Sequence, residues 1–564
     1  MTKIKQYISE TNWKKFFIIL LTIWFGVNLL QAIFTEIMDD EAYYALFGER
    51  LAWGYFDHPP MVGLMTFISD FLFNGNMSVR FLTILFQIFT IILIWKLLEE
   101  SAPNSNKVAL FFIITASMIM FATYGFVTAP DVPLLFFTTL FLYAYQRFLT
   151  KESWLSMLLL AISMAGMIYS KYHAFIIIGL VLLSNFKLIK SYKAWVAVVL
   201  MGILLVPHIN WQFEMDFPTF KYHLVGRSFG FQWDEFLGHF PNQLAVFNPF
   251  TLGAVIYVLI KYKPQTLFEK ALYFQIIGFQ LFFFFMAFRG YVQPHWTAPT
   301  TMAMIILLYR ASLKNEKLLR YVKNWVAPSI LLLIVMRIFL VTDLLPSRLR
   351  FSGKEITNKN IESVVGELPL VFTGSFQRSS TYQYFTKKEA ILLSGVNSRL
   401  TQFDLWQKEL DYQGKSVFIL ADIEGRSQEY IVDDTHFKGF VTNNLQTVNR
   451  LKIEYTLTKE EASTGNILII DFKIENPCNF DVNFNHSEFP VKVKSVYTKR
   501  RQKNIFECEL NESISIIPAK GSFKGTLKTV VPDLVPDDYQ FTLTLDNTIC
   551  PAINSYYVPL KITK

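Results

Sequence analysis

The chain has 564 residues, of which 52% are hydrophobic, 16% aromatic and only 17% charged. A soluble protein normally carries about 25% charged residues, so this composition excludes an ordinary soluble enzyme. The formal net charge of +8 suits cytoplasmic loops that face anionic lipid, and a nucleic-acid partner is not indicated because the basic residues form no patch. The hydrophobic bias covers residues 16–342 and then weakens, which predicts a membrane part followed by a water-exposed part.

The membrane part is predicted to contain about eleven spanning helices, several of them shorter than the roughly 20 residues that a full span needs. Their ranges are 16–35, 80–98, 108–123, 132–147, 154–169, 173–187, 194–209, 245–260, 271–288, 297–311 and 325–342. The fifth and sixth are alternatively one kinked pair that meets at Ser170-Lys171-Tyr172, which would change the count by one or two. No small-residue cleavage site precedes Glu36, so we expect a retained first helix rather than a signal peptide.

The basic residues predict the orientation in the membrane. Lysines precede the first helix, and further Lys and Arg residues fall in alternate loops, at 147–151, 187–193, 261–270 and 310–323. All of these lie on one side, which the positive-inside rule identifies as cytoplasmic. We therefore expect a multi-pass protein of the cytoplasmic (inner) membrane with a cytoplasmic N-terminus. Residues 36–79 and 343–564 would lie outside.

Two outer loops carry many aromatic residues. Residues 42–53 are predicted to form an amphipathic helix in the membrane interface, with its aromatic face toward lipid. Pro59-Pro60 would end that helix, and residues 61–73 would begin another. The second loop, residues 210–244, is rich in Trp, Phe, Tyr and His, as is typical of the headgroup level.

The pattern predicts three domains, at residues 1–342, 343–445 and 446–564. The second is expected to be a small extracytoplasmic α/β unit, with strands at 371–374 and 417–420 and a helix over 381–393. The third is expected to be a β-sandwich, with strands at 467–472, 491–496, 513–517 and 539–545. Its cysteines, Cys478, Cys508 and Cys550, allow one disulfide in an oxidising compartment and leave one thiol.

Acidic residues occur where chemistry at the membrane surface would need them. Asp39, Asp40 and Glu41 follow the first helix directly. Ionisable groups at membrane depth are costly and tend to mark substrate or proton chemistry. The triplet therefore predicts a general base and a partner that orients the acceptor or binds a cation, the alternative being a solvated start of a loop. Asp131 begins a helix in another outer loop, where it would otherwise only be favoured by the helix macrodipole.

Cationic candidates occur in other outer loops. Lys171 stands outside among Tyr and His residues, which suggests an anionic partner, the alternative being a side chain that snorkels to the interface. His58 and His295 each stand beside a proline, and Arg289 is close to the second. Such cations suit a phosphate leaving group, whereas the carboxylates suit proton removal. Weaker candidates, for which a structural role is the alternative, are His208, His223 and Arg227.

These residues lie in motifs that resemble a known family. The run DDEAYYALFGERLAWGYFDHPPMVGLM resembles the first outer loop of bacterial GT-C glycosyltransferases related to protein O-mannosyltransferases and to the lipid A aminoarabinose transferase (glycosyltransferase family 39). Further motifs follow in the expected order: APDVP at 129–133, SKYHA at 170–174, PHINWQFE at 207–214, FNP at 247–249 and QPHWTAP at 293–299. The resemblance covers residues 16–342, and its first and last motifs are the most specific. The C-terminal part has no counterpart, and the sandwich is open to binding an acceptor, a glycan or a partner.

The resemblance implies a fold, a reaction and roles for the candidate residues. The fold would be GT-C, and the enzyme would transfer a sugar, with inversion, from a polyprenyl phosphate such as undecaprenyl phosphate. The acceptor would be a lipid such as lipid A, a glycan or a protein on the outer face of the membrane. Asp40 would be the base, with Glu41 as its support and Asp39 as a further catalytic candidate. If a divalent metal ion takes part, Asp40 and Glu41 are its expected ligands, and no other cofactor is implied.

The remaining candidates receive roles at the donor and the acceptor. Asp131 would occupy the family's second acidic position, near the acceptor. His58, Lys171 and His295 would bind the donor phosphate, together with the nearby Arg289. Two other functions are considered: a transporter or flippase of lipid-linked sugars, and a non-catalytic glycan-binding assembly protein. The gathering of charges at one face and the lack of a repeat argue against transport. A binding protein would leave the carboxylates and cations without a purpose.

Overall fold

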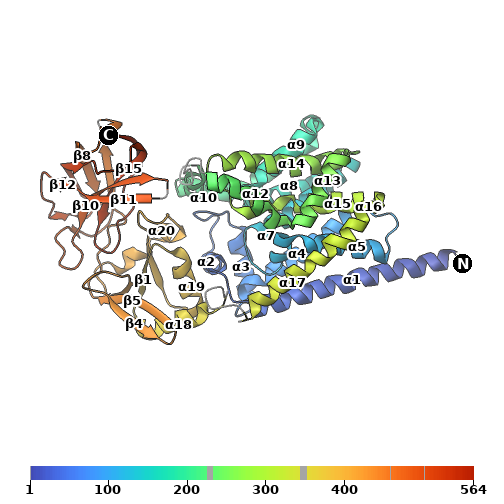
Figure 1. Ribbon diagram of the computed structural model, residues 1–564, viewed down its shortest axis with the longest axis horizontal. Coiled ribbons are helices and arrows are strands. Elements are labelled where there is room, and N and C mark those ends of the chain that lie inside the picture. The colour runs from blue at the N-terminus through green and yellow to red at the C-terminus, as the bar shows by residue number, and fades with distance from the viewer. Residues whose placement is uncertain (1, 225–232, 343, 345–351, 458, 501) are drawn as a thin grey trace. The chain divides into compact units, whose positions relative to one another are not determined.

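The computed structural model describes residues 2–224, 233–342, 344, 352–457, 459–500 and 502–564. The chain forms two compact units, Met1–Gly353 and Lys354–Lys564, the first helical and the second rich in strands (Figure 1). All eleven segments predicted to span the membrane contain helix. The helices of the first unit are α1 (Thr2–Phe34), α2 (Asp39–Glu49), α3 (Met61–Leu72), α4 (Met77–Leu97), α5 (Ser105–Ser117), α6 (Ile119–Thr123), α7 (Asp131–Thr150), α8 (Trp154–Ser170), α9 (Ala174–Ser184), η1 (Phe186–Lys190), α10 (Tyr192–Glu214), α11 (Pro218–Leu224), α12 (Trp233–Phe247), α13 (Pro249–Lys261), α14 (Leu267–Ala287), η2 (Pro294–Thr300), α15 (Thr301–Lys314), α16 (Glu316–Tyr321), η3 (Val322–Val326) and α17 (Ala327–Val341).

Fewer of these helices are long enough to span a membrane than the sequence predicts. Within the described residues, six are long and apolar enough: residues Asn12–Phe34 of α1, then α4, α7, α10, α14 and the run Glu316–Val341. The bent pair α12 and α13 brings the number to seven if the pair is counted as one span. Other predicted spans are shorter because the chain leaves the helix early, at Met118 after α5 and at Lys171 between α8 and α9.

The break between α12 and α13 is built by one residue. The two helices meet at an angle of 100°, and Asn248 between them has a φ of 68°, which few side chains adopt. Its side-chain oxygen accepts a hydrogen bond from Phe250 N, and its Nδ2 donates to Ser329 Oγ at 2.7 Å. Asn tolerates this backbone conformation and also caps the helix that follows.

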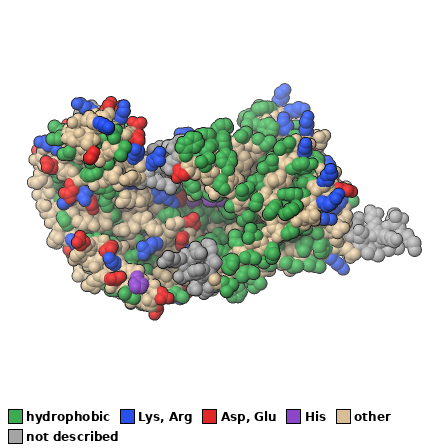
Figure 2. All heavy atoms as spheres, viewed as in Figure 1, with side chains coloured by type: hydrophobic (Ala, Val, Ile, Leu, Met, Phe, Trp, Pro, Cys, Tyr) green, Lys and Arg blue, Asp and Glu red, His purple; other side chains and the backbone are tan. Residues whose placement is uncertain are grey.

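Burial separates lipid-facing helices from central ones. The apolar windows of α1, α10 and Glu316–Val341 are 22%, 22% and 17% buried, whereas that of α7 is 67% buried, so α7 is central. In Figure 2, hydrophobic side chains cover this unit, and Lys and Arg side chains gather at the end where α1 begins. This end contains the loops in which the basic residues were noted.

The first outer loop folds differently from the prediction. Its helix, α2, ends at Glu49, well before Pro59-Pro60. Its aromatic face is turned into the protein and not toward lipid: Phe47 is fully buried and stacks on Tyr55 with ring centroids 3.9 Å apart. Helix α3, which begins at Met61 as predicted, packs against α2. The apolar residues of α2 are therefore covered by protein inside the unit. The second loop, 210–244, is largely helical where it is described, in α10, α11 and α12.

The second unit begins with an α/β sheet in the strand order β2-β1-β3-β5-β4. Strand β1 pairs in parallel with β2 and β3, and β5 pairs antiparallel with β3 and β4. The helix predicted over 381–393 is wrong at its C-terminal end, because α19 stops at Thr386 and Ala390–Leu393 form buried strand β2. The elements are α18 (Lys354–Val365), β1 (Leu370–Thr373), α19 (Phe376–Thr386), β2 (Ala390–Leu393), α20 (Gln402–Trp406), η5 (Lys408–Tyr412), β3 (Val417–Leu420), β4 (Gln428–Val432) and β5 (Thr435–Thr442).

A β-sandwich follows in the same unit, so the C-terminal β-rich region is confirmed. One sheet has the order β11-β10-β15-β16-β7, the other β12-β14-β8-β6, with a short pair of β13 and β9 beside them. Of the strand predicted at 513–517, only Ile516 and Ile517 pair. The strands are β6 (Lys452–Thr456), β7 (Glu461–Ser463), β8 (Ile467–Glu475), β9 (Val482–Asn483), β10 (Lys492–Lys499), β11 (Gln502–Glu507), β12 (Glu509–Leu510), β13 (Ile516–Ile517), β14 (Ser522–Val530), β15 (Asp537–Asp546) and β16 (Val558–Thr563). A domain boundary between 445 and 446, which would fall between β5 and β6, stays a proposal.

The three cysteines are all free thiols, so the one disulfide that the sequence allows is not formed. Each occupies a different place. Cys478 is buried in the turn after β8, Cys508 packs against the core of the sandwich, and Cys550 packs against that of the α/β sheet. Burial raises the pKa of all three thiols, that of Cys550 to about 12. A raised pKa leaves little reactive thiolate at neutral pH.

Thiol labelling tests this arrangement. Protein extracted from membranes without reductant should accept three maleimide labels per chain after denaturation, counted by mass spectrometry. The folded protein at pH 7 should react much more slowly, because its thiols are buried or partly buried and are protonated. One label on the denatured chain, rising to three only after reduction, would show that a disulfide exists.

Candidate active site

The acidic triplet forms the first turn of α2. Asp39, Asp40 and Glu41 are its first three residues, after the N-cap residue Met38. Carboxylates are stabilised there because the N-terminus of a helix carries a partial positive charge. The structure separates the three by exposure: Asp40 is exposed, Asp39 is partly exposed and Glu41 is only 1% exposed. The triplet therefore serves more than one purpose.

Glu41 belongs to a buried ion pair with Arg80 of α4. Arg80 is fully buried, its Nε donates to Glu41 Oε1 at 2.8 Å and its Nη2 donates to Oε2. The same carboxylate accepts hydrogen bonds from Thr128 N at 2.8 Å and from Met38 N at 3.0 Å. A buried ion pair needs such additional hydrogen bonds to offset the loss of water, and both oxygens of Glu41 are occupied.

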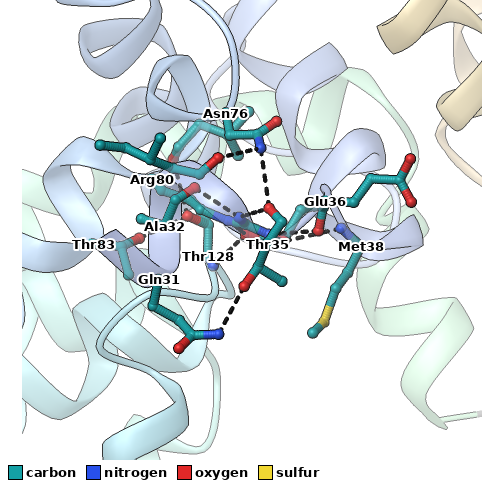
Figure 3. A network of polar contacts seen from close by, with 12 residues as sticks. Gln31, Ala32, Thr35, Glu36, Met38, Asn76, Arg80, Thr83 and Thr128 are labelled. Carbon is teal, nitrogen blue, oxygen red and sulfur yellow. Dashed lines mark hydrogen bonds and ion pairs between the residues drawn. The ribbon is translucent and has the colours of Figure 1, made fainter. Parts of the chain in front are cut away.

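Arg80 also holds the end of the first helix. Its Nη1 donates to the carbonyl oxygens of Ala32 at 3.0 Å and Thr35 at 2.5 Å, and its Nη2 to that of Glu36 at 3.0 Å. Asn76, one helical turn before Arg80, donates to Thr35 O at 3.0 Å. Figure 3 shows Arg80 in the middle of this network. The pair thus joins the end of α1, the start of α2, α4 and the segment before α7.

Tyr44 connects the exposed carboxylate to the rest of the site. It is buried on α2, and burial raises the pKa of its hydroxyl well above the usual value, with further contributions from the negative charges of Asp40, Asp57 and Asp131. The hydroxyl therefore stays protonated. It lies 3.4 Å from His58 Nε2, so Tyr44 lies among Asp40, Asp57, Asp131 and His58.

Asp131 and Lys171 form a second buried ion pair. Lys171 Nζ donates to both carboxylate oxygens of Asp131 at 3.0 Å, and His295 Nε2 lies 3.8 Å from Oδ2. Asp131 also interacts electrostatically with His58. The side chain of Asp131 is 2% exposed, that of Lys171 10% and that of His295 30%, so the two cations are nearer to the surface than the carboxylate that binds them.

The other predicted residues lie apart from this cluster. The structure places His208 in a separate network, where Nε2 lies 2.8 Å from the hydroxyl of Tyr172 and Nδ1 contacts Trp53 O. Arg289 is exposed in the segment after α14. Arg227 and the side chain of His223 lie outside the described residues. Over the described ranges, no group of three or more His, Cys, Asp or Glu residues could hold a metal ion.

The sequence analysis did not identify several residues of the site. Arg80 stood at the start of a predicted span, where an arginine at membrane depth is itself a signal. Tyr44 and Asp57 were noted only as part of the first motif. Tyr124 was also missed: its pKa is raised well above the usual value by burial, then by the charge of Asp131 and of Tyr44 and by a hydrogen bond to Asp131. Buried tyrosines near carboxylates have no sequence signature of their own.

Three comparisons with known proteins show which family and fold the chain resembles. Residues 57–211 match the model of a family described as dolichyl-phosphate-mannose-protein mannosyltransferase. A solved structure with the same fold is ArnT from Cupriavidus metallidurans, both in the apo state and bound to undecaprenyl phosphate, with a TM-score of 0.55 at 13% identity over 76% of this chain and 98% of that one. An uncharacterized protein of Aquifex aeolicus is 24% identical over 277 residues, which are 47% of this chain and 54% of that protein. The chain thus spans about half the length of this curated relative.

Fold and site together define a class. The chain is a multi-pass membrane protein with the GT-C fold of membrane glycosyltransferases, as the motifs predicted. Within that fold, residues 57–211 are the part that matches the mannosyltransferase family model, and they include His58, Asp131 and Lys171. The predicted resemblance is therefore confirmed.

We expect the buried Arg80–Glu41 pair to be required for the stability of the protein. Arg80→Met should destabilise the protein by about 3–5 kcal/mol, because it leaves the Glu41 charge buried without a partner. The double variant Glu41→Leu, Arg80→Met should recover part of that loss. The measurement is the temperature of aggregation in detergent, followed by fluorescence-detected size exclusion.

Lys107→Met is the matched control. It removes a pair with Glu100 at 2.7 Å whose side chains are 24% and 12% exposed, and such a pair contributes at most about 1 kcal/mol. Equal stability losses in Arg80→Met and Lys107→Met would contradict the structural role of Arg80.

Proposed function

We propose that this protein is a membrane glycosyltransferase that moves a sugar from a polyprenyl phosphate to a lipid, glycan or protein acceptor. The observation that carries the proposal is that an exposed carboxylate, Asp40, and the cation-binding residue Asp131 both lie near Tyr44. Tyr44 lies within electrostatic reach of both. Proton removal and phosphate departure, the two demands of such a transfer, thus have separate groups within a single site.

Asp40 is the general base in this proposal. It accepts the proton of the acceptor hydroxyl while the acceptor oxygen forms a bond to the anomeric carbon of the sugar. The bond from that carbon to the phosphate oxygen breaks on the opposite side, so the anomeric configuration inverts. The electron pair leaves with the polyprenyl phosphate. The helix N-terminus of α2 favours the charged form of Asp40 before the reaction.

Lys171, His58 and His295 receive the phosphate. Two hydrogen bonds of Lys171 Nζ go to Asp131, and this orients an ammonium group whose positive charge would attract a phosphate. In this arrangement Asp131 orients Lys171 and His295, and its occupied oxygens make direct contact with the acceptor a weaker alternative. Glu41 supports Asp40 by fixing the helix that carries it, since its own oxygens are taken by Arg80 and two backbone N–H groups. Asp39 is partly exposed beside Asp40 and is the reserve candidate for the base. Arg289 lies apart from the cluster and would contact only the lipid part of the donor.

The likeness to ArnT supports the donor class, and the distribution of Lys and Arg residues supports the orientation. The structural relative ArnT binds undecaprenyl phosphate, which supports a polyprenyl-phosphate donor here. The gathering of Lys and Arg at one end of the helical unit (Figure 2) supports a cytoplasmic location for that end. The site and residues 343–564 would then face the outside of the inner membrane.

Asp40→Asn should abolish sugar transfer while the protein remains folded, because the amide keeps the shape of the side chain but accepts no proton. The purified protein is incubated in lipid with a panel of undecaprenyl-phosphate sugars and membrane extract as acceptor. Mass spectrometry follows the release of undecaprenyl phosphate. General-base catalysis typically contributes about 10²–10⁴-fold in rate, and a loss in that range is expected.

Asp39→Asn is the matched control for that experiment, since it removes a neighbouring carboxylate of the same helix turn. It should retain most of the activity. An active Asp40→Asn enzyme together with an inactive Asp39→Asn enzyme would move the base to Asp39. Full activity of both variants would contradict a carboxylate base in this turn.

Lys171→Met should lower kcat/KM for the donor by at least about tenfold, because a hydrogen bond to a charged group contributes about 1.5–3 kcal/mol and about 1.4 kcal/mol is tenfold. The double variant Asp131→Asn, Lys171→Met should lose little more than Lys171→Met, since paired groups act as a unit. The kinetics are measured with the donor identified above.

Lys151→Met is the control, at an exposed lysine after α7. It should leave donor kinetics unchanged. The role given to Lys171 is wrong if Lys171→Met has the kcat/KM of Lys151→Met.

A further inference from the structure

The second unit contains a cleft that the proposed transfer reaction does not use. It lies at the β4 edge of the α/β sheet and has a volume of about 490 Å³, within the roughly 300–1,000 Å³ typical of small-molecule sites. Residues from three segments line it: Arg426 and Gln428 before and on β4, Tyr430 on β4, and Glu488 from the segment between β9 and β10. Its walls thus combine a cation, a carboxylate, an amide and an aromatic ring.

The cation in this cleft is incompletely satisfied. The guanidinium of Arg426 lies over the ring of Phe489, 5.4 Å from its centroid. Its Nη1 atom is buried and has no hydrogen-bonding partner in the part of the chain that the structure describes. A buried donor without a partner costs free energy, and an arginine can bind a carboxylate or phosphate through two parallel hydrogen bonds. Because Arg426 lines the cleft, an anionic ligand there could pair with its guanidinium, whose hydrogen-bonding capacity the described part of the protein does not fill.

The turn that carries Arg426 is held in place by the backbone. Ser427 Oγ donates to Ala421 O at 2.7 Å and accepts from Ile423 N at 2.9 Å, and Arg426 N donates to Ile423 O at 3.1 Å. Gly425 has a φ of 76°, a conformation that glycine adopts without strain. Because the turn is rigid, little ordering entropy is lost when a ligand binds to Arg426.

The opposite wall is equally fixed. His486 Nδ1 accepts from the backbone N–H groups of Glu488 and Phe489 at 3.2 and 3.1 Å, and its ring stacks on Phe489 with centroids 5.5 Å apart. Glu488 Oε2 accepts from Thr442 Oγ1 at 2.8 Å. The carboxylate of Glu488 is thereby oriented and has room to accept further hydrogen bonds from hydroxyl groups.

Tyr430 provides an apolar surface between these walls. Its ring stacks on Phe437 with centroids 5.3 Å apart and an interplanar angle of 20°, which fixes its plane. A ligand with hydroxyl groups for Glu488 and Gln428, an apolar face for Tyr430 and an anionic group for Arg426 has the chemistry of an acidic sugar.

We propose that this cleft binds an anionic saccharide, one that carries a carboxylate or a phosphate group, with Arg426 as the anchor of the charge. The residues of this site belong to the second unit and those of the candidate active site to the first, and the proposal does not depend on the proposed transfer reaction. A glycan held here would be the acceptor or a cell-envelope polymer that tethers the enzyme.

The test is isothermal titration of the full-length protein in detergent. The probes are a glucuronic acid disaccharide, the same disaccharide with its carboxylate reduced to a hydroxymethyl group, glucose 6-phosphate, and inorganic phosphate. The wild type should bind one of the two anionic sugars at least tenfold more tightly than the reduced disaccharide and than inorganic phosphate. Which of the two binds distinguishes a carboxylate ligand from a phosphate ligand.

Three variants locate the binding. Arg426→Gln should abolish the preference for the anionic sugar, and Tyr430→Ala should weaken binding of charged and neutral sugars alike. The matched control is Arg399→Gln, which removes a guanidinium stacked 4.6 Å from the ring centroid of Phe376 in the same unit, and it should bind like the wild type.

Several outcomes would overturn the proposal. These are equal affinity for the acidic and the reduced disaccharide, equal affinity for inorganic phosphate, an unchanged preference in Arg426→Gln, or no heat with any probe at millimolar concentration. The titration contains no lipid-linked donor, so its failure leaves the transfer reaction untouched. Loss of transfer activity in Asp40→Asn likewise leaves the saccharide site untouched.

Discussion

The buried ion pair of Arg80 and Glu41 determines how the rest of the helical unit presents its reactive groups. Arg80 donates to three backbone carbonyl oxygens at the end of α1, and Glu41 accepts from two backbone N–H groups. Because two buried charges tolerate only a geometry in which both are satisfied, the start of α2 has one position and one rotation. Successive residues of a helix lie about 100° apart around its axis. When Glu41 points inward, its neighbour Asp40 is turned outward, where an acceptor can reach it.

The acidic triplet thus contains a buried residue, Glu41, and an exposed one, Asp40. This difference shows which features of the site could be predicted from the sequence and which could not. The motifs identified the fold, the eleven helical segments and the residues Asp131, Lys171 and His295, which the structure brings together. They gave Glu41 a supporting role beside Asp40 but did not reveal its buried ion pair, because the partner of Glu41 lies 39 positions away in another helix. They also placed the aromatic face of α2 in lipid, because helical periodicity shows that a face is apolar but not which apolar surface it meets.

The same limit applies to the span count and to the second unit. Apolar composition continues across Met118, Lys171 and Asn248, whereas the helices break there through local hydrogen bonds that composition does not record. In Ala390–Leu393, four apolar residues after a helix were read as its continuation. These residues form a strand instead, because they pair with β1. A short apolar run is ambiguous between helix and strand until its neighbours in space are known.

In the proposed transfer, the charge balance of the Asp131 cluster would affect how fast the phosphate is released. A lysine with no carboxylate beside it would hold a phosphate strongly and also release it slowly. Asp131 takes two of the hydrogen bonds of Lys171, and its negative charge reduces the attraction that remains for the donor. His295 and His58 add donors whose charge depends on their protonation. In the proposed reaction, the negative charge of the phosphate grows as its bond to the sugar breaks. The cluster would then stabilise the transition state more than the bound donor, and such a difference accelerates a reaction. Among the described residues, Arg426 forms no ion pair with a carboxylate, although Glu488 lines the same cleft. This difference is why we propose that Arg426 holds a ligand that stays bound and not a leaving group that must depart.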